Sequence, residues 1–379
     1  MAEWHDVRLG DLVDNFDSKR LPVKASERRE GPHPYYGASG VVDWVDDYLL
    51  DGEYLLVSED GENLRSRTTP IAFTVSGKFW PNNHVHVLRG KESVDTAFLK
   101  YALALTDITG YLTGSAQPKL SRGSMDAIRL RVPDLSVRRA IAEVLGALDD
   151  KIAANSRLAA TADALASARF AQAVEGTGLS EETFADVAHI GGGATPRSKV
   201  PEYWDGGVRW LTPTDVTALT GPYVWETKRT ISEEGLAAIS SLLYPRGTIF
   251  MTSRATIGAF AIAEEPMAAN QGFIALQPRD GVSRYWLFHE MRSRVPEFLD
   301  HANGATFLEL SRGNFKKLRV RRLSIEAERR FEAEARVLHE RASAALRENS
   351  VLSATRDTLL PQLMSGKLRV REAAEMAGL

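Results

Sequence analysis

The sequence predicts a mixed α/β (α+β) protein in which two globular domains of the same plan alternate with two long helices. Three observations predict this fold class: an internal repeat, a Gly-, Pro- and Trp-rich stretch of short strands in each half, and a long helix-forming stretch at the end of each half. At about 150 residues per domain, 379 residues suggest two or three domains. The predicted segments are a first globular domain at 1–133, a central helical segment at 134–176, a second globular domain at 177–323, and a C-terminal helical segment with its tail at 324–379.

The internal repeat consists of short matching stretches at a nearly constant offset. Residues 120–125 (LSRGSM) are matched 190 positions later by residues 310–315 (LSRGNF). Residues 82–83 (NN) are matched 188 positions later by residues 270–271 (NQ), and an alternating strand-like stretch follows each pair. Two halves of about equal length, related by a pseudo-twofold repeat, are therefore expected.

Each globular domain is expected to be built from short strands joined by turns. In the first domain, residues 54–57, 71–75 and 84–88 are short apolar or alternating runs bounded by Gly, Pro and Asn. Residues 184–323 repeat this composition in the second half. We therefore expect a mixed α/β domain in each half.

The helical segments carry heptad spacing. Residues 137–170 contain no Pro and are rich in Ala, and residues 325–360, before Pro361, have the same character. Apolar residues recur at steps of four and three, with one Asn in each predicted seam, so the two helices are expected to pair as an antiparallel coiled coil. The assigned pairing residues are Leu145, Leu148, Ile152, Asn155, Leu338, Asn349, Leu352 and Leu359.

Two features of these helices leave room for other interpretations. In the first helix the seam resumes at Leu158 and Leu165 after an extra step of three, which predicts a local stammer. Each helix could also simply cover its own sheet. If the helices pair, thirty residues at about 1.5 Å each form a strut of about 45 Å, close to the 34–36 Å between DNA half-sites one turn apart.

Composition excludes several classes of protein. Lys and Arg total 47 against 50 Asp and Glu, so the net charge is -3 and any nucleic-acid surface must be local. The chain has no Cys, which excludes disulfides, thiolate metal sites and Cys nucleophiles. With neither a leader-like N-terminus nor a run of 18 apolar residues, the expectation is a soluble cytoplasmic protein with no membrane partner.

No catalytic motif stands out. The strings at residues 76–78 and 365–367 (both SGK) lack the first Gly and the Ser or Thr of a phosphate-binding loop. Residues 191–193 (GGG) lack the spacing of a dinucleotide loop and are expected to form a mobile loop or tight turn. His84 and His86 alternate on one predicted strand without a third ligand, so a structural or DNA-facing role is favoured over a metal site.

Local basic strips recur in both halves. The candidates for contact with the DNA backbone lie within the repeated LSRG motif, directly before it or shortly after it, and they are Lys119, Arg122, Arg312, Lys316, Lys317 and Arg319. Phosphates would suit such strips, although solvated strand and turn faces have the same composition. Recurrence in both halves favours binding.

The loops beside the repeated strands carry side chains of the types that read base edges. Arg and Lys pair with guanine and Asn and Gln with adenine in the major groove, while any of them could instead cap a turn. The base-readout candidates are Arg65, Arg67, Lys78, Asn82, Asn83, His84, Thr252, Ser253, Arg254, Asn270 and Gln271.

Several longer motifs carry a family resemblance. In the first half they are residues 34–40 (PYYGASG), 51–57 (DGEYLLV), 59–61 (EDG) and 117–121 (QPKLS). In the second half they are residues 193–196 (GATP), 201–204 (PEYW), 253–258 (SRATIG), 270–273 (NQGF) and 356–363 (RDTLLPQL). With these motifs the chain resembles, over essentially its whole length, the specificity subunit of a type I restriction-modification system.

The resemblance implies two target-recognition domains, each reading one half of a bipartite and asymmetric DNA sequence. It further implies that the helical regions space these domains and dock two modification (methyltransferase) subunits, and through them restriction (translocase and nuclease) subunits. The chain itself is then non-catalytic and holds no metal or cofactor, while S-adenosylmethionine, ATP and Mg bind to partner subunits. Residues 133–139 and 323–329 lack the family's proline-rich lead and Glu-Gln pair, so no residue is assigned to a methyltransferase contact.

Two rival functions remain open at the level of sequence. A self-sufficient DNA methyltransferase or nuclease would need cofactor and catalytic motifs that the chain does not show. A coiled-coil scaffold that binds proteins but no DNA is compatible with the net charge of -3. Salt-dependent binding to duplex DNA would discriminate against the scaffold.

Overall fold

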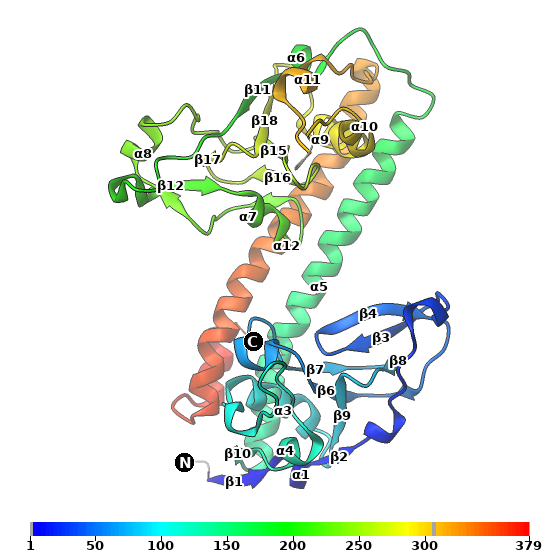
Figure 1. Cartoon of the computed structure of the whole chain (residues 1–379), viewed down its shortest axis with the longest axis vertical. Helices are drawn as coiled ribbons and strands as arrows, with labels where there is room; N and C mark the ends of the chain where they lie inside the picture. The colour runs from blue at the N-terminus through cyan, green and yellow to red at the C-terminus, as the bar shows by residue number, and fades with distance from the viewer. Residues whose placement is uncertain (1–2, 305–307, 379) are drawn as a thin grey trace. The chain divides into compact units, whose positions relative to one another are not determined.

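The computed structural model describes residues 3–304 and 308–378, and the chain divides into two compact units (Figure 1). Unit 1 comprises Met1–Ile152 and Ser350–Leu379, and unit 2 comprises Ala153–Asn349. The predicted mixed α/β class is confirmed. The packing divides the chain differently from the four predicted segments, because each long helix contributes residues to both units.

Unit 1 contains two four-stranded sheets and a two-stranded sheet. The first sheet has the order β2-β9-β6-β7 and is antiparallel, with bounds Val13–Asn15, Val85–Gly90, Tyr54–Ser58 and Ala72–Val75. The second sheet has the order β4-β3-β8-β5, with bounds Gly40–Val45, His33–Gly37, Lys78–Pro81 and Leu50–Asp51. Strand β1 (Trp4–Arg8) pairs with β10 (Arg129–Pro133). The unit's short helices are α1 (Leu9–Leu12), α2 (Asn63–Ser66), α3 (Asp95–Leu105), α4 (Arg122–Asp126) and α13 (Val370–Ala377), with 3-10 turns at Asp17–Lys19, Ala25–Glu27 and Thr109–Tyr111.

Strand β6 lies between two hydrophobic clusters, since successive side chains of a strand point to opposite faces. Leu55 and Val57 pack in the cluster that includes Phe98 of α3. Tyr54 and Leu56 pack in the cluster that includes Phe79 of the second sheet. Every residue of β6 is therefore buried, and this strand fixes the position of the loop that follows it.

Unit 2 repeats this plan with a five-stranded sheet of order β11-β18-β15-β16-β13. Its strands are Ala188–Gly192, Phe273–Pro278, Ile249–Thr252, Phe260–Ala263 and Tyr223–Val224. A three-stranded sheet has the order β14-β12-β17, with bounds Thr230–Ile231, Trp204–Leu211 and Met267–Ala269. The short helices are α6 (Phe184–Val187), α7 (Pro213–Thr217), α8 (Glu233–Ala237), α9 (Arg284–Ser293), α10 (Val295–Asp300) and α11 (Arg312–Lys317), with a 3-10 turn at Pro201–Tyr203. As in β6, Ile249 and Met251 of β15 pack on one cluster and Phe250 on another.

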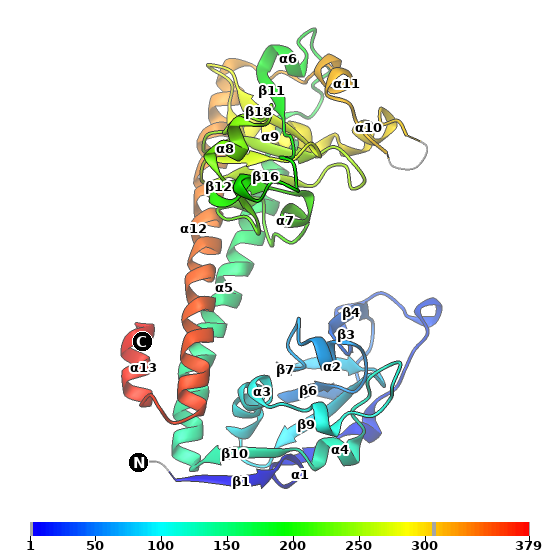
Figure 2. The ribbon, with the colours of Figure 1, turned by 60° about the vertical axis from the view of Figure 1, so that its left-hand side comes forward.

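The long helices α5 (Leu135–Ala173) and α12 (Ile325–Met364) contact each other within each unit (Figures 1 and 2). In unit 1, Leu145 and Leu148 lie in the same buried cluster as Leu359 and Leu363, and Arg356 donates to Asp149 at 2.8 Å.

In unit 2, the rings of Phe170 and Phe331 are 5.6 Å apart, and the Asn155 amide donates to Glu348 at 2.7 Å. Phe170 lies late in α5 and contacts Phe331 early in α12, whereas Asp149 lies early in α5 and contacts Arg356 late in α12. The two helices therefore run in opposite directions.

The buried face of α5 differs from the predicted seam. Leu158 and Leu165 are exposed, while Asn155, Ala159, Ala162, Ala166 and Phe170 are buried. The steps of four and three therefore continue through Ala166 without a break, and the predicted stammer is wrong. Hydrophobicity alone favours the two Leu side chains for the seam, but Ala occupies the contact face because its small side chain suits close packing of helices.

Helix α12 continues through Pro361 to Met364, beyond the predicted end at residue 360. A Pro inside a helix removes one backbone hydrogen bond. Here it lies in the last turn, where Ser365 donates to its carbonyl at 3.1 Å. Among the residues that the structure describes, no helix has the length and apolar character needed to cross a lipid bilayer.

A buried histidine pair joins α9 to α12 in unit 2. The Nε2 atoms of His289 and His339 are 2.9 Å apart, so one ring donates to the other. The Tyr223 hydroxyl contacts Nδ1 of His339 at 2.7 Å. Burial, followed by the nearby Arg292, lowers the pKa of His289 to about 4, against a smaller opposing effect of Asp163. Burial, followed by His289, Arg284 and Arg292, lowers the pKa of His339 to about 3.

This pair predicts a loss of stability in mild acid. Below pH 6.5 the unfolded histidines bind protons that the folded pair does not, so the free energy of unfolding falls as pH falls towards about 4. One histidine accounts for about 2 kcal/mol between about pH 6.5 and 5, above the range in which most carboxylates titrate. Urea unfolding at several pH values measures this slope, and His339→Gln should reduce it. An unchanged slope in a folded His339→Gln variant would contradict the assignment.

Candidate nucleic-acid interface

In unit 2, five of the predicted DNA-contacting residues line one hollow of about 460 Å³. They come from the ends of β15 and β18 and from α11, and they are Ser253, Arg254, Gln271, Arg312 and Lys316. Glu309 and the backbone of Gly193 complete the polar part of the wall. The fold thus gathers at one place side chains that are 63 positions apart in the sequence.

Backbone hydrogen bonds hold the three segments of this hollow together. The Ser253 amide donates to the Gly272 carbonyl at 2.8 Å, and the Leu310 amide donates to the Ser253 carbonyl at 2.9 Å. The next residue, Arg254, forms an ion pair in which its Nε lies 2.8 Å from Oε1 of Glu309, and both side chains remain more than 40% exposed. The guanidinium is therefore positioned by one carboxylate and retains accessible donors.

Helix α11 begins at the rim of the hollow. Ser311 caps the helix by accepting from the Asn314 amide at 3.1 Å, and Arg312 is its first residue. The Arg312 guanidinium lies against Gly192, where an added Cβ would be only 3.0 Å from it. The predicted mobile loop or tight turn at residues 191–193 is wrong for the first two glycines, which belong to strand β11 and pack closely against Tyr244 and Arg312.

Unit 1 has the same backbone arrangement. The Glu59 amide donates to the His84 carbonyl at 2.9 Å, and the Leu120 amide donates to the Glu59 carbonyl at 2.7 Å. Ser121 caps α4 by accepting from the Ser124 amide at 3.2 Å. The predicted repeat is therefore confirmed at the level of individual hydrogen bonds.

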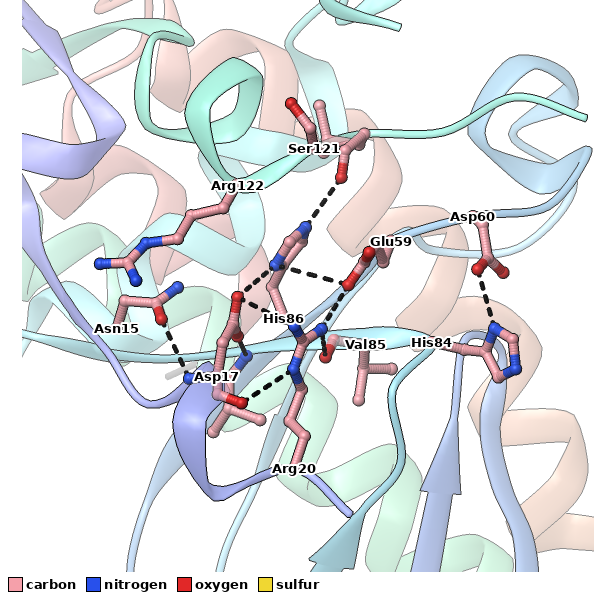
Figure 3. A network of polar contacts seen from close by, with 12 residues as sticks. Asn15, Asp17, Arg20, Glu59, Asp60, His84, Val85, His86, Ser121 and Arg122 are labelled. Carbon is pink, nitrogen blue, oxygen red and sulfur yellow. Dashed lines mark hydrogen bonds and ion pairs between the residues drawn. The ribbon is translucent and has the colours of Figure 1, made fainter. Parts of the chain in front are cut away.

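The side chains on this arrangement in unit 1 form a polar network around His86 (Figure 3). Nδ1 of His86 lies 2.7 Å from Asp17, and Nε2 lies 2.8 Å from the Leu120 carbonyl. Arg20 bridges Glu59, the Val85 carbonyl at 2.9 Å and Asp17 at 3.5 Å. The network ties β9 and β6 to the segment before α4.

The two carboxylates of the network remain ionised. Burial alone would raise the pKa of Asp17, but hydrogen bonds from His86 and from the Val87 amide, at 2.9 Å, lower it below the ordinary value. Burial would likewise raise the pKa of Glu59, and hydrogen bonds from Arg20 and Lys119 lower it. Each carboxylate is thus held ionised by the basic side chains paired with it.

His84 and His86 occupy different environments. His86 lies in strand β9 and is buried, whereas His84 precedes the strand and is exposed. Nδ1 of His84 lies 2.8 Å from Asp60, apart from the His86 network (Figure 3). Lys119 lies 3.1 Å from Glu59 and is about half exposed. His84 and Lys119 are thus the most exposed polar side chains of this group, and Asp60 is about 20% exposed.

Three base-readout candidates have side chains engaged in the fold. The Asn82 Oδ1 accepts from the His84 amide and the Asn270 Oδ1 accepts from the Gly272 amide, each at 2.8 Å. The buried Thr252 hydroxyl donates to the Thr256 carbonyl and accepts from the Ala259 amide. These bonds form the turns that present the neighbouring residues.

Arg67 and Arg65 also contact the backbone of unit 1. Arg67 has a left-handed conformation at the end of α2 and donates to the Leu103 and Thr106 carbonyls, which lie near the end of α3. Arg65 donates to the Gly114 carbonyl at 2.9 Å and is partly exposed. Lys78 lies 4.5 Å from the centre of the Tyr48 ring. Of these, Arg67 has the clearest structural role.

The remaining candidates are exposed. Asn83, Gln271 and Lys317 lie on the surface, and Gln271 accepts from the Thr195 hydroxyl. Arg122 lies 3.7 Å from Asp126, and Arg319 donates to Glu181 at 3.0 Å. Surface ion pairs of this kind are weak, so they can be exchanged for phosphate contacts at little cost.

Sequence reasoning missed the acidic members of both sites, Glu59, Asp60 and Glu309. A carboxylate can accept from a base amino group, so acidic residues can also contribute to base readout. In the repeat they occupy the positions equivalent to Ser253, Arg254 and Lys119, and this equivalence carried a usable signal. Across the described ranges 3–304 and 308–378, no three His, Asp or Glu side chains are grouped to hold a metal ion.

Comparisons with known proteins identify the family and the fold of the chain. The family model described as "Type I restriction modification DNA specificity domain" matches residues 1–162 and 180–321. A type I restriction enzyme specificity subunit, MjaIX, from Methanocaldococcus jannaschii is 37% identical over 137 residues, which cover 36% of this chain and 32% of that protein. A putative type I specificity subunit from Haemophilus influenzae is 38% identical over 147 residues, covering 39% of this chain and 37% of that protein.

The matched stretches therefore span about a third of the length of these two relatives. The solved structure of a type I restriction-modification S subunit from M. genitalium aligns with a TM-score of 0.65 at 15% identity. The alignment covers 96% of each chain, and it shows that the two proteins share a fold.

Proposed function

The chain belongs to the type I restriction modification DNA specificity family, and from this membership we propose that it reads a bipartite DNA sequence. Each unit would read one half-site, and the complete target would be asymmetric because the side chains of the two sites differ. The observation that carries the proposal is the repeated backbone arrangement, which presents exposed polar side chains at equivalent places in both units. Arg122 and Arg312, each the first residue of a capped helix, are the proposed phosphate contacts.

We assign the chemistry to other proteins. Modification subunits would bring S-adenosylmethionine and methylate the DNA, and restriction subunits would use ATP and Mg. The chain would contribute recognition without catalysis. Its helices α5 and α12 are the proposed docking and spacing elements, in line with the specificity subunits that the chain resembles.

Selection of bound duplexes from a random library by the purified chain tests the proposal. Two separated sequence elements should be enriched, and affinity should fall steeply between 50 and 200 mM salt because phosphate contacts release counterions. A chain that binds all duplexes equally, or none, would refute sequence readout. If the chain is instead a coiled-coil scaffold, it should bind no duplex.

Adenine methylation in cells tests the proposed partners separately. Cells that express this chain with a modification subunit that co-purifies with it should show methylation in a two-part motif. The same subunit expressed alone is the control and should leave that motif unmodified. A motif that appears without this chain would remove the specificity role.

A further inference from the structure

The two units contain structurally equivalent positions that can be paired from their backbone hydrogen bonds. In unit 1, the loop after β6 forms backbone hydrogen bonds with the loop before β9 and with the segment before α4. In unit 2, the loop after β15 forms the same bonds with the loop before β18 and with the segment before α11. In unit 1 these bonds run from the amide of the first residue to the carbonyl of the second, and they are Glu59 to His84, Leu120 to Glu59 and Gly61 to Pro118. In unit 2 the equivalent bonds are Ser253 to Gly272, Leu310 to Ser253 and Ala255 to Leu308. Position 60 is therefore equivalent to 254, position 119 to 309, and position 122 to 312.

Some side chains are the same at equivalent positions. Asn82 and Asn270 make the same turn bond, Ser121 and Ser311 make the same helix cap, and Arg122 and Arg312 follow those caps. Side chains that are constant between two sites for different sequences suit contacts that all DNA shares, namely the phosphates.

Other side chains reverse their charge. Asp60 is replaced by Arg254, and Lys119 is replaced by Glu309. Within each unit the two positions face each other across an isolated β-bridge. The bridge joins Asp60 to Lys119 in unit 1 and Arg254 to Glu309 in unit 2. Arg254, Glu309 and Lys119 are each more than 40% exposed, and Asp60 is about 20% exposed. The reversal therefore lies on the accessible edge of the site.

We propose that this charge reversal determines the different base preferences of the two units. Arg254, oriented by Glu309, donates to the O6 and N7 acceptors of a guanine in one half-site. Asp60 accepts from the exocyclic amino group of a cytosine or adenine in the other half-site. This inference rests on the proposed function and names the residues that give each half-site its sequence.

The arrangement of partners supports these assignments. The contact of Arg254 with Glu309 is through Nε, and the side chain is 46% exposed, so the terminal N–H groups of the guanidinium can reach a guanine edge, as bidentate contact requires. Asp60 uses one oxygen, Oδ2, with His84 and keeps its other oxygen as an acceptor. A carboxylate and a guanidinium at the same position of the same backbone cannot prefer the same base edge.

Selection from a library with both half-sites randomised, using the full-length purified chain, tests the inference. For Arg254→Gln we expect one position of one half-site to change from guanine to adenine, with a loss of about 5- to 150-fold on the native target. The other half-site should stay as in the native chain. In the converse variant, Asp60→Arg with Lys119→Glu, a guanine should appear in the other half-site.

Arg312→Ala is the matched control for a constant position. It should weaken binding to all sequences by a similar factor and reduce the salt slope by about 1, without changing the preferred bases. The inference is overturned if Arg254→Gln or the double variant, folded by circular dichroism, selects the native sequence. A native chain that selects no sequence overturns the proposed function itself, so the two failures are distinguishable.

Discussion

Replacing Asp17 with alanine is expected to destabilise unit 1 by about 3 to 5 kcal/mol. Asp17 is almost fully buried and accepts from His86 at 2.7 Å and from the Val87 amide at 2.9 Å. Without the carboxylate, a buried imidazole and a backbone amide lose their acceptor together. Urea unfolding of the full chain, followed by circular dichroism, should show one transition shifted to lower denaturant.

Asp60→Ala is the matched control for this prediction. Asp60 also pairs with a histidine, but its partner His84 is about half exposed and solvent can replace the lost contact. Exposed ion pairs contribute about 1 kcal/mol or less, so the unfolding midpoint should barely move. Equal effects of the two substitutions would show that burial does not set the contribution of Asp17.

Replacing Leu148 with aspartate is expected to cost at least about 4 kcal/mol, since it places an unpaired charge in the core of unit 1. Leu148 is 2% exposed and belongs to the cluster that contains Leu359 and Leu363 of α12. The variant should lose the contact between the two helices in this unit. Thermal unfolding and limited proteolysis would detect the loss.

Leu158→Asp on the same helix tests which face of α5 packs against α12, the observed one or the one predicted from hydrophobicity. Leu158 is 48% exposed, so this substitution should change stability by about 0.5 kcal/mol or less. A seam with a stammer through Leu158 and Leu165 would make both substitutions costly. A large loss for Leu158→Asp would therefore favour the seam predicted from sequence.

The sequence by itself determined the features that depend on neighbouring residues. The LSRG repeat encodes Ser121 and Ser311 as helix caps, because a cap bonds a backbone amide three residues ahead. The end of strand β10 at Pro133 and the start of the second long helix at Ile325 follow from local composition in the same way. An internal repeat needs no tertiary information at all.

Only the tertiary structure decided which candidate side chains are available to DNA. Asn82 and Asn270 have the residue type of adenine readers, but their Oδ1 atoms are used within their own turns. Arg67 is used by carbonyls that lie 36 and 39 positions further along the chain. Such long-range bonds depend on how strands and helices pack. Residue type and local spacing do not reveal this packing.

The roles of the carboxylates were likewise decided by the fold. A lone acidic residue in a sequence argues against phosphate binding, whereas the structure places Asp60 and Arg254 at the same position of two equivalent backbones. The sequence therefore determined that the chain has two copies of one recognition plan. The tertiary structure decided how the copies differ, because the identity of a contact depends on which distant side chains the strand pairing brings beside it.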